Sequence, residues 1–422
     1  MLWAASPALA QSRWDVDFNN DGARTNQDII DRDLVAAGAE IPGVDSLDFN
    51  GDGVTPDDRD TLQFYQVYAG GPGPDGWTPV FTDVDPVIPV GPTREHRTIR
   101  SAIMALPAVF VDGVRYTPGT IVVDTDVEPQ EVRGEYDSIS VGGLPGRPLV
   151  IVGAPGDRPK LTWARVMNAD HVRLIGLDFN SYVSVLGSSS NVLIEDVRVV
   201  GTSSLGFRFD GLSSGVGLVT LRRSIAADSR NPEGHVQGAY ITNVSDLVID
   251  GCVFYNTGNR DTFCQGLYRV WGGRTILTGN FFINAGFAGA QLRGGYVFVE
   301  GNVSARNGNG FGFSHPMAVP HGVPVWGIVS HNWVDQCKYP EWGIALMSGA
   351  GLVIEYNTIS GCDVPFITAR EQGLNIDTGD VTLTNNQVTQ GSSLDWERIG
   401  TALRDRPRGV WGDRYDAVNY IP

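Results

Sequence analysis

The sequence predicts an all-β solenoid, in which short parallel strands wind one coil after another around a single axis. Two observations predict this fold: a strand pattern that repeats through most of the chain, and an asparagine that recurs at one place in the repeat. Composition agrees, because 53 glycines and only 19% charged residues in a chain of 422 fit many turns between short strands. We expect about eleven coils between residues 98 and 391.

Each repeat holds an apolar residue, a corner residue three positions later, and usually another apolar residue two positions beyond it. The corner positions recur every 20 to 30 residues and are Leu177, Val197, Ser224, Cys252, Asn280, Asn302, Asn332, Asn357 and Asn386. Segments this short, β-branched and bounded by Gly and Asn exclude a helical solenoid, which needs runs of roughly ten residues at helical spacing. Asparagine tolerates the left-handed backbone of a bend, and its amide can bond the asparagine one coil above. We therefore expect an asparagine ladder along one corner.

This repeat resembles the right-handed parallel β-helix proteins of the pectate-lyase-like kind, over roughly residues 98–391. The resemblance implies a right-handed parallel β-helix. It implies no single activity, because that architecture hosts lyases, hydrolases, epimerases, adhesins and phage spikes. Signatures of particular enzymes are missing: Gly234 and His235 lack the second glycine of a polygalacturonase-like motif, and His315 precedes Pro316, the reverse of the epimerase order.

Charge and the start of the chain bear on location and partners. The net charge of −17 argues against nucleic acid and against an anionic membrane surface. Residues 1–11 resemble the small-residue end of a secretory signal but lack its basic start and full apolar core, so the alternative is an apolar tail. We expect a secreted, extracellular protein. No stretch approaches the roughly 18 apolar residues that a membrane span needs.

Two of the four cysteines fall at equivalent places in the repeat. Cys337 and Cys362 each lie five residues after a ladder asparagine, so they should lie on adjacent coils about 4.8 Å apart. That separation permits a disulfide in an oxidising compartment; the alternative is a pair of buried thiols. We do not expect Cys252 and Cys264 to pair.

Residues 12–72 carry two acidic loops that suit calcium. Carboxylate, amide and hydroxyl oxygens stand at the ligand spacing of a calcium loop, with a backbone carbonyl at the seventh position. The first ligand set is Asp17, Asn19, Asp21, Ala23, Thr25 and Asp28, and the second is Asp48, Asn50, Asp52, Val54, Asp57 and Asp60. In the second loop Arg59 occupies position 12, so the closing carboxylate comes from Asp58 or Asp60, of which we choose Asp60. Two such loops, each followed by a helix, resemble a dockerin module, which implies two Ca²⁺ ions and a protein partner.

The remaining segments are expected to flank the coil. Residues 73–97 are rich in glycine and proline and are expected to form a linker. The apolar spacing in residues 98–106 predicts an amphipathic helix that covers the first coil. The segments Gly119–Val123 and Leu149–Val152 are expected to begin the coil itself. Residues 392–422 are expected to form a C-terminal cap or tail.

The candidate site comes from the segments that precede the ladder. Residues 235–241 align with residues 263–269, and this alignment makes Arg269 and Arg293 vertical neighbours on the surface. Stacked arginines beside amides and aromatic rings would bind the carboxylates or sulfates of an acidic polysaccharide, because guanidinium binds planar anions bidentately. The candidate catalytic residues are Arg269, Arg293, His235 and Tyr268. The candidate substrate-binding residues are Gln237, Tyr240, Gln265, Trp271, Gln291 and His315.

Three functions remain open. The patch predicts a lyase-like enzyme, in which Arg, His or Tyr removes the proton beside a neutralised carboxylate, or a binding module without turnover. The third is a structural or adhesive protein that assembles head-to-tail into filaments through its N-terminal module and coil ends. For the patch itself, the alternative is structural: Gln and Tyr would stack in ladders, and the arginines would pair with the acidic surface.

Overall fold

The structure is a computed structural model that divides the chain into two compact units, Met1–Thr82 and Asp83–Pro422. It describes residues 86–111, 113–124, 138–144, 147–154, 158–203, 205–211, 215–229, 236–258, 264–314, 325–338, 342–346, 351–368 and 381–391. All of these belong to the second unit. The signal-like segment, the calcium module and the C-terminal tail that the sequence predicts therefore lie outside the described residues.

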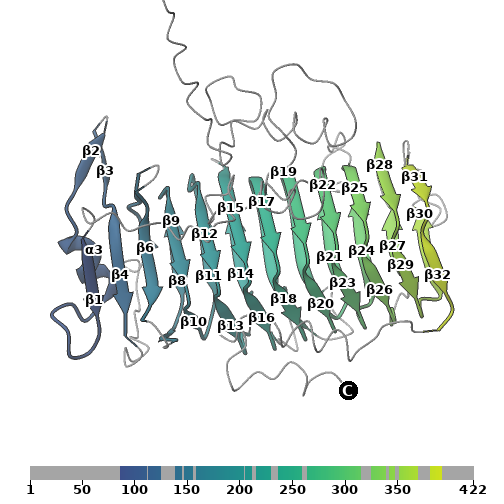
Figure 1. Cartoon of the computed structure of the whole chain (residues 1–422), viewed down its shortest axis with the longest axis horizontal. Coiled ribbons are helices and arrows are strands. Elements are labelled where there is room, and N and C mark those ends of the chain that lie inside the picture. The colour runs from purple at the N-terminus through teal and green to yellow at the C-terminus, as the bar shows by residue number, and fades with distance from the viewer. Residues whose placement is uncertain are drawn as a thin grey trace, which may run out of the picture. The chain divides into compact units, whose positions relative to one another are not determined.

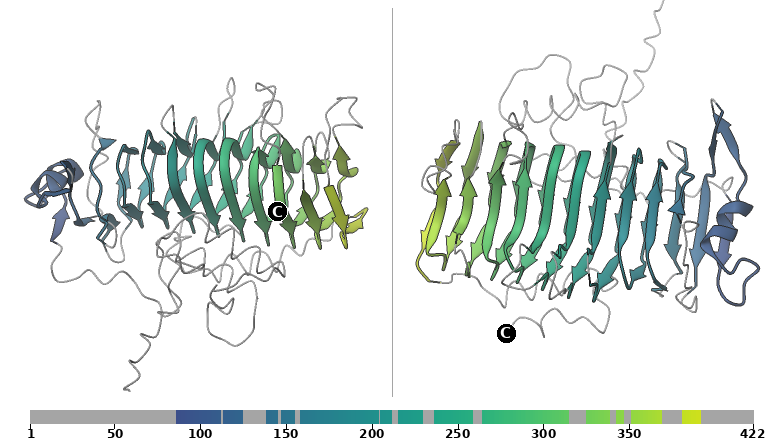
Figure 2. Two further views of the ribbon diagram at one scale, coloured as in Figure 1. Left: turned by 90° about the horizontal axis from the view of Figure 1, so that it is seen from above. Right: turned by 180° about the vertical axis from the view of Figure 1, so that it is seen from behind.

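The described part of the second unit is a parallel β-helix, whose strands follow one another along its long axis (Figures 1 and 2). Each coil presents three faces in chain order. Face 1 comprises β5 (Ser138–Ile139), β8 (Ala164–Met167), β11 (Val183–Leu186), β14 (Phe207–Asp210), the first parts of β17 (Ala239–Asp250) and β19 (Gln265–Thr278), β21 (Ala288–Arg293), β24 (Asn309–Ser314), β27 (Trp342–Leu346) and β30 (Val364–Thr368). Because β17 and β19 continue into the next face, faces 1 and 2 form one sheet.

Face 2 comprises β1 (Val87–Val90), β4 (Gly119–Val123), β6 (Leu149–Gly153), β9 (Val172–Ile175), β12 (Val192–Glu195), β15 (Val216–Arg222), the later parts of β17 and β19, β22 (Gly295–Glu300), β25 (Val325–Ser330), β28 (Leu352–Glu355) and β31 (Val381–Thr384). Face 3 is a separate sheet of β7 (Lys160–Leu161), β10 (Asp178–Phe179), β13 (Arg198–Val200), β16 (Ile225–Ala227), β18 (Val253–Tyr255), β20 (Phe281–Ile283), β23 (Val303–Ala305), β26 (Trp333–Asp335), β29 (Thr358–Ser360) and β32 (Gln387–Thr389). The expected count of about eleven coils stays a prediction.

The first coil is capped by helix α3 (Ile99–Ala105), which confirms the predicted helix. Thr98 is its N-cap and shares a capping box with Ser101, which satisfies backbone N–H groups at the helix start. Leu106 is 2% exposed and meets Gly119 of β4. Strand β1 lies within the expected linker and pairs with β4, so this part of residues 73–97 belongs to the sheet. An antiparallel hairpin of β2 (Val109–Val111) and β3 (Val114–Tyr116) follows the helix.

The asparagine ladder is confirmed at the corner between faces 2 and 3. Asn302 Oδ1 accepts hydrogen bonds from both the backbone N–H and the side-chain Nδ2 of Asn280, each at 2.9 Å. The same pair of bonds joins Asn302 to Asn332, and continues through Asn357 to Asn386. Each amide therefore replaces backbone partners that the turn removes from the strand ladder.

The predicted left-handed backbone is not found at the ladder asparagines. The residue with the left-handed backbone is the one before the ladder position, for example His331 and Tyr356, both at φ 53°. No ladder asparagine has positive φ. The side-chain hydrogen bonds along the coil, and not backbone tolerance, account for asparagine here.

The Cys337–Cys362 disulfide is confirmed, with its Cα atoms 4.9 Å apart on adjacent coils. Cys252 and Cys264 are buried and are not joined by a disulfide. The disulfide closes a loop between the last coils, where the described structure ends at β31 and β32.

A column of glycines runs along the start of face 1, and the sequence analysis missed it. Its members are Gly206, Gly238, Gly266, Gly289, Gly310 and Gly343. A Cβ on Gly266 would lie 2.6 Å from the carbonyl oxygen of Gly289 and 3.1 Å from the Phe282 ring. Glycine is needed where another backbone approaches this closely. The repeated Gln-Gly at Gln237 and Gln265 was the available signal.

We expect Gly266→Ala to lower the free energy of unfolding by about 1–3 kcal/mol, because the new methyl group overpacks a corner that the next coil holds in place. Gly312→Ala is the matched control, since its Cβ would meet nothing closer than Gln291 at 3.5 Å. Urea denaturation measures both variants. Equal stability of the two variants would contradict the close approach.

Candidate functional site

Face 1 carries an outward row of basic and aromatic side chains on consecutive strands. Its central column is fixed by the parallel register and runs through Arg165, Ser184, Arg208, Tyr240, Tyr268 and Gln291. We use the name face 1 row for Trp163, Arg165, Tyr182, Arg208, Tyr240, Tyr268, Gln291 and Arg293. Beyond Gln291 the column continues with Gly312 and Ala345, so the polar and aromatic groups end there.

The N-terminal half of the row is a packed cluster. The rings of Trp163 and Tyr182 stack with centroids 5.9 Å apart and planes 16° from parallel. The guanidinium of Arg165 lies 5.2 Å from the Trp163 ring centroid, and its Nη2 donates to Tyr182 Oη at 3.2 Å. These contacts hold the arginine in one place against aromatic faces. Further along, the exposed Arg208 pairs with Asp210 at 2.7 Å.

The C-terminal half of the row centres on two tyrosines. Tyr240 and Tyr268 lie with ring centroids 5.9 Å apart, and the guanidinium of Arg293 lies 5.0 Å from the Tyr268 ring. Burial raises the pKa of Tyr268; Arg293 opposes this shift and Tyr240 adds to it. The Tyr268 hydroxyl is therefore protonated at neutral pH and able to donate a hydrogen bond.

Both arginines at the ends of the row keep an unused donor. The Nε atoms of Arg165 and Arg293 are buried and have no hydrogen-bond partner within the structure described. The Nε atoms of the buried Arg222 and Arg269 also have no partner, so this feature is shared with arginines that do not belong to the row.

The glutamines form a ladder, which was the structural alternative for this patch. Gln237 Nε2 donates to Gln265 Oε1 at 3.3 Å, and Gln265 Nε2 donates to Gln291 Oε1 at 3.1 Å. Gln237 and Gln265 are 7% and 3% exposed, so they stabilise the coils beneath the row. Only Gln291, at the end of the ladder, is half-buried.

Arg269 requires a correction, because it is not a surface neighbour of Arg293. The register places Leu292 beside Arg269 and Val270 beside Arg293. Arg269 is 0% exposed and lies inside the coil, where Nη1 donates to the carbonyl of Arg274 at 2.5 Å and Nη2 to that of Val244 at 2.9 Å. Burial lowers its pKa to about 9, and Asp246 opposes the shift. Arg269 therefore braces the bend between faces 1 and 2.

Trp271 stands at that bend, with φ 51° and 49% of its surface exposed. Trp271 lies just after the face 1 part of β19, and Arg293 lies on the next strand of that face, β21. His235 and His315 lie outside the described residues, as do Arg260 and Asp261. Of the predicted site, the structure therefore brings together Tyr240, Tyr268, Gln291 and Arg293. It adds Trp163, Arg165, Tyr182 and Arg208, which the sequence analysis did not select because they precede its aligned repeats.

No cluster of His, Cys, Asp and Glu side chains that could hold a metal ion occurs in the described ranges. All predicted calcium ligands lie in residues 17–60, outside those ranges. Within the described part of the chain, no helix has the length and apolar character to cross a membrane.

The fold and the row define a right-handed parallel β-helix protein with an arginine–aromatic face. Residues 212–394 match a family model described as "Right handed beta helix region". No curated protein matches the chain.

Three solved structures are similar to the chain at low identity. A rhamnogalacturonan lyase is 11% identical, with 77% of this chain and 94% of that chain covered and a TM-score of 0.44. An alginate lyase from Paenibacillus sp. str. FPU-7 is 12% identical, with 69% and 95% covered and a TM-score of 0.42. The pectate lyase Pel9A is 13% identical, with 71% and 77% covered and a TM-score of 0.40. These likenesses concern the fold alone.

Proposed function

We propose that the protein binds an acidic or sulfated extracellular polysaccharide lengthwise along the face 1 row. The observation that carries this proposal is the row itself, in which three arginines alternate with aromatic rings. From Arg165 on β8 to Arg293 on β21 there are five strand spacings, or roughly 24 Å at about 4.8 Å each. One strand spacing is comparable to the length of one sugar ring, so an extended chain would meet a new group on each coil.

The chemistry of the row suits such a polymer. Guanidinium groups bind carboxylates and sulfates through paired hydrogen bonds, and aromatic faces pack against the C–H faces of sugar rings. The protein has a net charge of −17, so a basic row is a local exception on an acidic chain. Binding should therefore weaken as salt rises, and neutral polysaccharides should bind poorly.

Arg208→Ala and Arg293→Ala should each weaken polysaccharide binding about tenfold, because each removes a charge-assisted hydrogen bond worth roughly 1.5 kcal/mol. Calorimetry with a uronan and a sulfated glycan measures the affinity, and a neutral glucan is the ligand control. Arg94→Ala is the matched variant, since Arg94 is similarly exposed and pairs with Asp124 at 2.6 Å away from the row. The proposal fails if Arg94→Ala weakens binding as much as the two row variants.

The second candidate is a lyase that acts on the same polymer, and it is favoured by the contact of Arg293 with Tyr268. In β-elimination a base removes the proton at C5 of a uronate, a C4–C5 double bond forms, and the C4–O bond breaks. Arg293 would neutralise the carboxylate. Tyr268, which contacts Arg293, would donate its proton to the departing oxygen. The base would be His235, the histidine predicted as a catalytic residue.

Turnover of the polysaccharide distinguishes a lyase from a protein that only binds it. A lyase produces an unsaturated sugar with a new ultraviolet absorbance, and Tyr268→Phe should abolish that signal while the polymer still binds. If uronans bind to the parent protein but no absorbance develops on any of them, the lyase candidate is overturned and binding alone stands.

We further propose that the protein is exported and that residues 17–60 bind two Ca²⁺ ions through the two ligand sets given above. The chemistry of the donor sets supports the calcium proposal, because hard oxygen ligands at this spacing suit Ca²⁺. Calorimetric titration of the chelator-treated full chain should show two bound ions. Asp17→Asn together with Asp21→Asn should remove one of them.

A further inference from the structure

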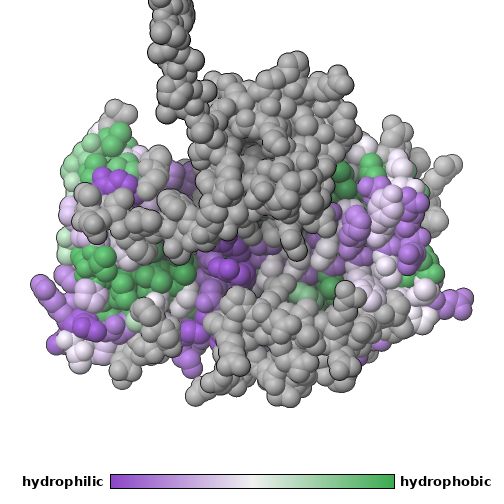
Figure 3. Space-filling model, in the orientation of Figure 1, coloured by the Kyte–Doolittle hydropathy of each residue, from purple (hydrophilic) through white to green (hydrophobic). Residues whose placement is uncertain are grey.

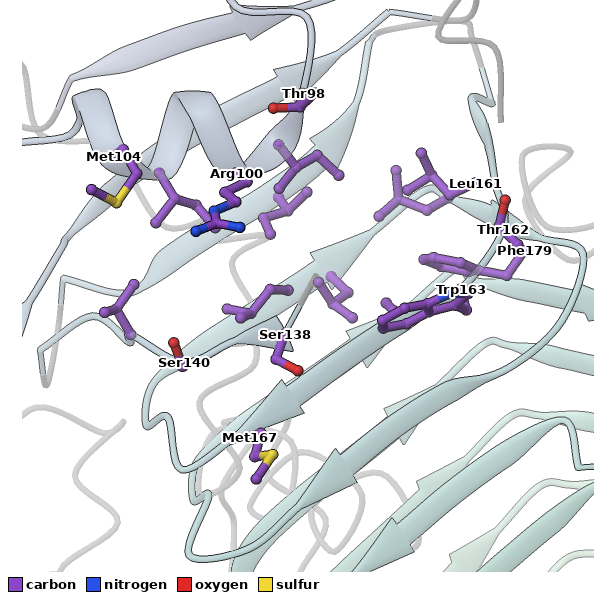
Figure 4. A pocket seen from close by; sticks show the side chains of 18 of the residues that line it. Thr98, Arg100, Met104, Ser138, Ser140, Leu161, Thr162, Trp163, Met167 and Phe179 are labelled. Atoms are coloured by element: carbon purple, nitrogen blue, oxygen red, sulfur yellow. The ribbon is translucent and has the colours of Figure 1, made fainter. Parts of the chain in front are cut away.

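An apolar cavity of about 530 Å³ opens at the N-terminal end of the coil, between α3, the hairpin strand β3 and early strands of all three faces. Figure 4 shows it between the helix, which carries Thr98, Arg100 and Met104, and the opposite wall of Leu161, Trp163 and Phe179. Figure 3 shows hydrophobic surface gathered at this end of the molecule. The face 1 row meets the cavity only at Trp163, so most of the cavity belongs to no site described above.

We propose that this cavity binds a single-chain amphiphile of the fatty-acid class, with its alkyl chain inside and its anionic head at the mouth. The proposal is independent of the polysaccharide function. The volume of the cavity, about 530 Å³, falls in the usual range for small-molecule sites, roughly 300–1,000 Å³.

The walls favour an alkyl chain over a sugar or an aromatic ring. Aliphatic side chains dominate them, including Ile99 and Ile103 of α3, Ile139 of β5, Ile151 of β6 and Leu174 of β9. Leu174 and Ile151 are also residues of the hydrophobic core, so the cavity leads directly into the interior of the coil. An alkyl chain in this position gains free energy because its apolar surface is removed from water.

The mouth favours an anionic head. Arg100 and Arg115 line the cavity, and no carboxylate appears among the described residues that line it, although the chain as a whole is acidic. In Figure 4 the Arg100 side chain extends from α3 toward the side of the cavity that carries Ser138 and Ser140. Arg115 Nε is buried and has no hydrogen-bond partner in the structure described. The hydroxyls of Thr98, Ser138 and Ser140 add donors that a carboxylate accepts.

The first test is calorimetry of the full chain with octanoate, decanoate and dodecanoate, each below its micelle concentration. Affinity should rise about fourfold for each added methylene, which is the fold-change that corresponds to burying one CH₂ at about 0.8 kcal/mol. Alkyl sulfates of equal length should bind, and alkyltrimethylammonium ions should not. Affinity that is independent of chain length, or equal for anionic and cationic heads, would overturn the proposal.

The second test uses variants of the cavity. Arg100→Gln should weaken dodecanoate binding about tenfold, and Arg97→Gln, an exposed arginine three residues earlier and outside the lining, should leave it unchanged. Ala164→Leu, on the wall, should reduce binding by filling space, with circular dichroism as the check on folding. Equal binding by Arg100→Gln and Arg97→Gln overturns the proposal even if Ala164→Leu does not fold. Polysaccharide binding is measured on the same variants and should not change, so the failure of one proposal leaves the other intact.

Discussion

Arg269→Ala should lower the free energy of unfolding by about 3–5 kcal/mol, one of the two largest effects that we expect in this protein. The substitution removes two charge-assisted hydrogen bonds, to the carbonyls of Val244 and Arg274, each worth roughly 1.5–3 kcal/mol. It also opens a cavity behind Gly272, whose missing side chain makes room for the guanidinium. Arg269→Met should cost less, because it refills most of the volume.

Arg293→Ala is the matched comparison, because both arginines lie on adjacent strands of face 1 but on opposite sides of the sheet. Arg293→Ala should leave stability within about 0.5 kcal/mol and weaken polysaccharide binding. Urea denaturation and calorimetry on the same samples measure both properties. If Arg269→Ala is as stable as the parent protein and loses binding, Arg269 belongs to the site and the placement inside the coil is wrong.

Asn302→Ala should lower the free energy of unfolding by about 2–5 kcal/mol. Its Oδ1 is the acceptor for the buried backbone N–H of Asn280, and its Nδ2 donates to the carbonyl of Leu277 at 2.9 Å. Each group left without a partner inside the coil costs roughly 1–3 kcal/mol. Asn302 is 1% exposed, so water cannot replace the amide without opening the corner.

Asn386, at the end of the ladder, provides the control for Asn302→Ala. Asn386 is the last ladder residue described and is half-buried, so Asn386→Ala should cost less than Asn302→Ala. Hydrogen exchange should show faster exchange at the Asn280 amide in Asn302→Ala. Unchanged protection of that amide, with unchanged stability, would mean that the ladder does not hold the corner.

The fold could be read from the sequence because the repeat fixes it locally. An apolar residue, a corner and a second apolar residue set the alternation of inward and outward side chains, and the recurrence of asparagine marks the ladder corner. The proximity of Cys337 and Cys362 follows from the same frame, because they stand at equal distances after two ladder positions, and the structure joins them in a disulfide. Head-to-tail assembly and the calcium module stay predictions, since the residues that would form them are not all within the described ranges.

The candidate site was predicted only in part, and the physical reason is register. Aligning Arg269 with Arg293 requires a register one residue away from the observed one, in which Tyr268 lies beside Gln291. A slip of one residue moves a strand side chain to the opposite face of the sheet. Because the coils differ in length, the sequence does not specify which residues of neighbouring strands pair with one another.

The sequence by itself therefore determined the parallel coil, its ladder corner and the neighbouring positions of Cys337 and Cys362, because each depends on spacing within a repeat. Only the tertiary structure decided that Arg269 points inward and Arg293 outward, that glycines line the start of face 1, and that a cavity opens beneath α3. These features depend on how neighbouring coils and the cap lie against one another. Contacts between segments far apart in the sequence set these features, and only the glycine column has a local signal, the repeated Gln-Gly.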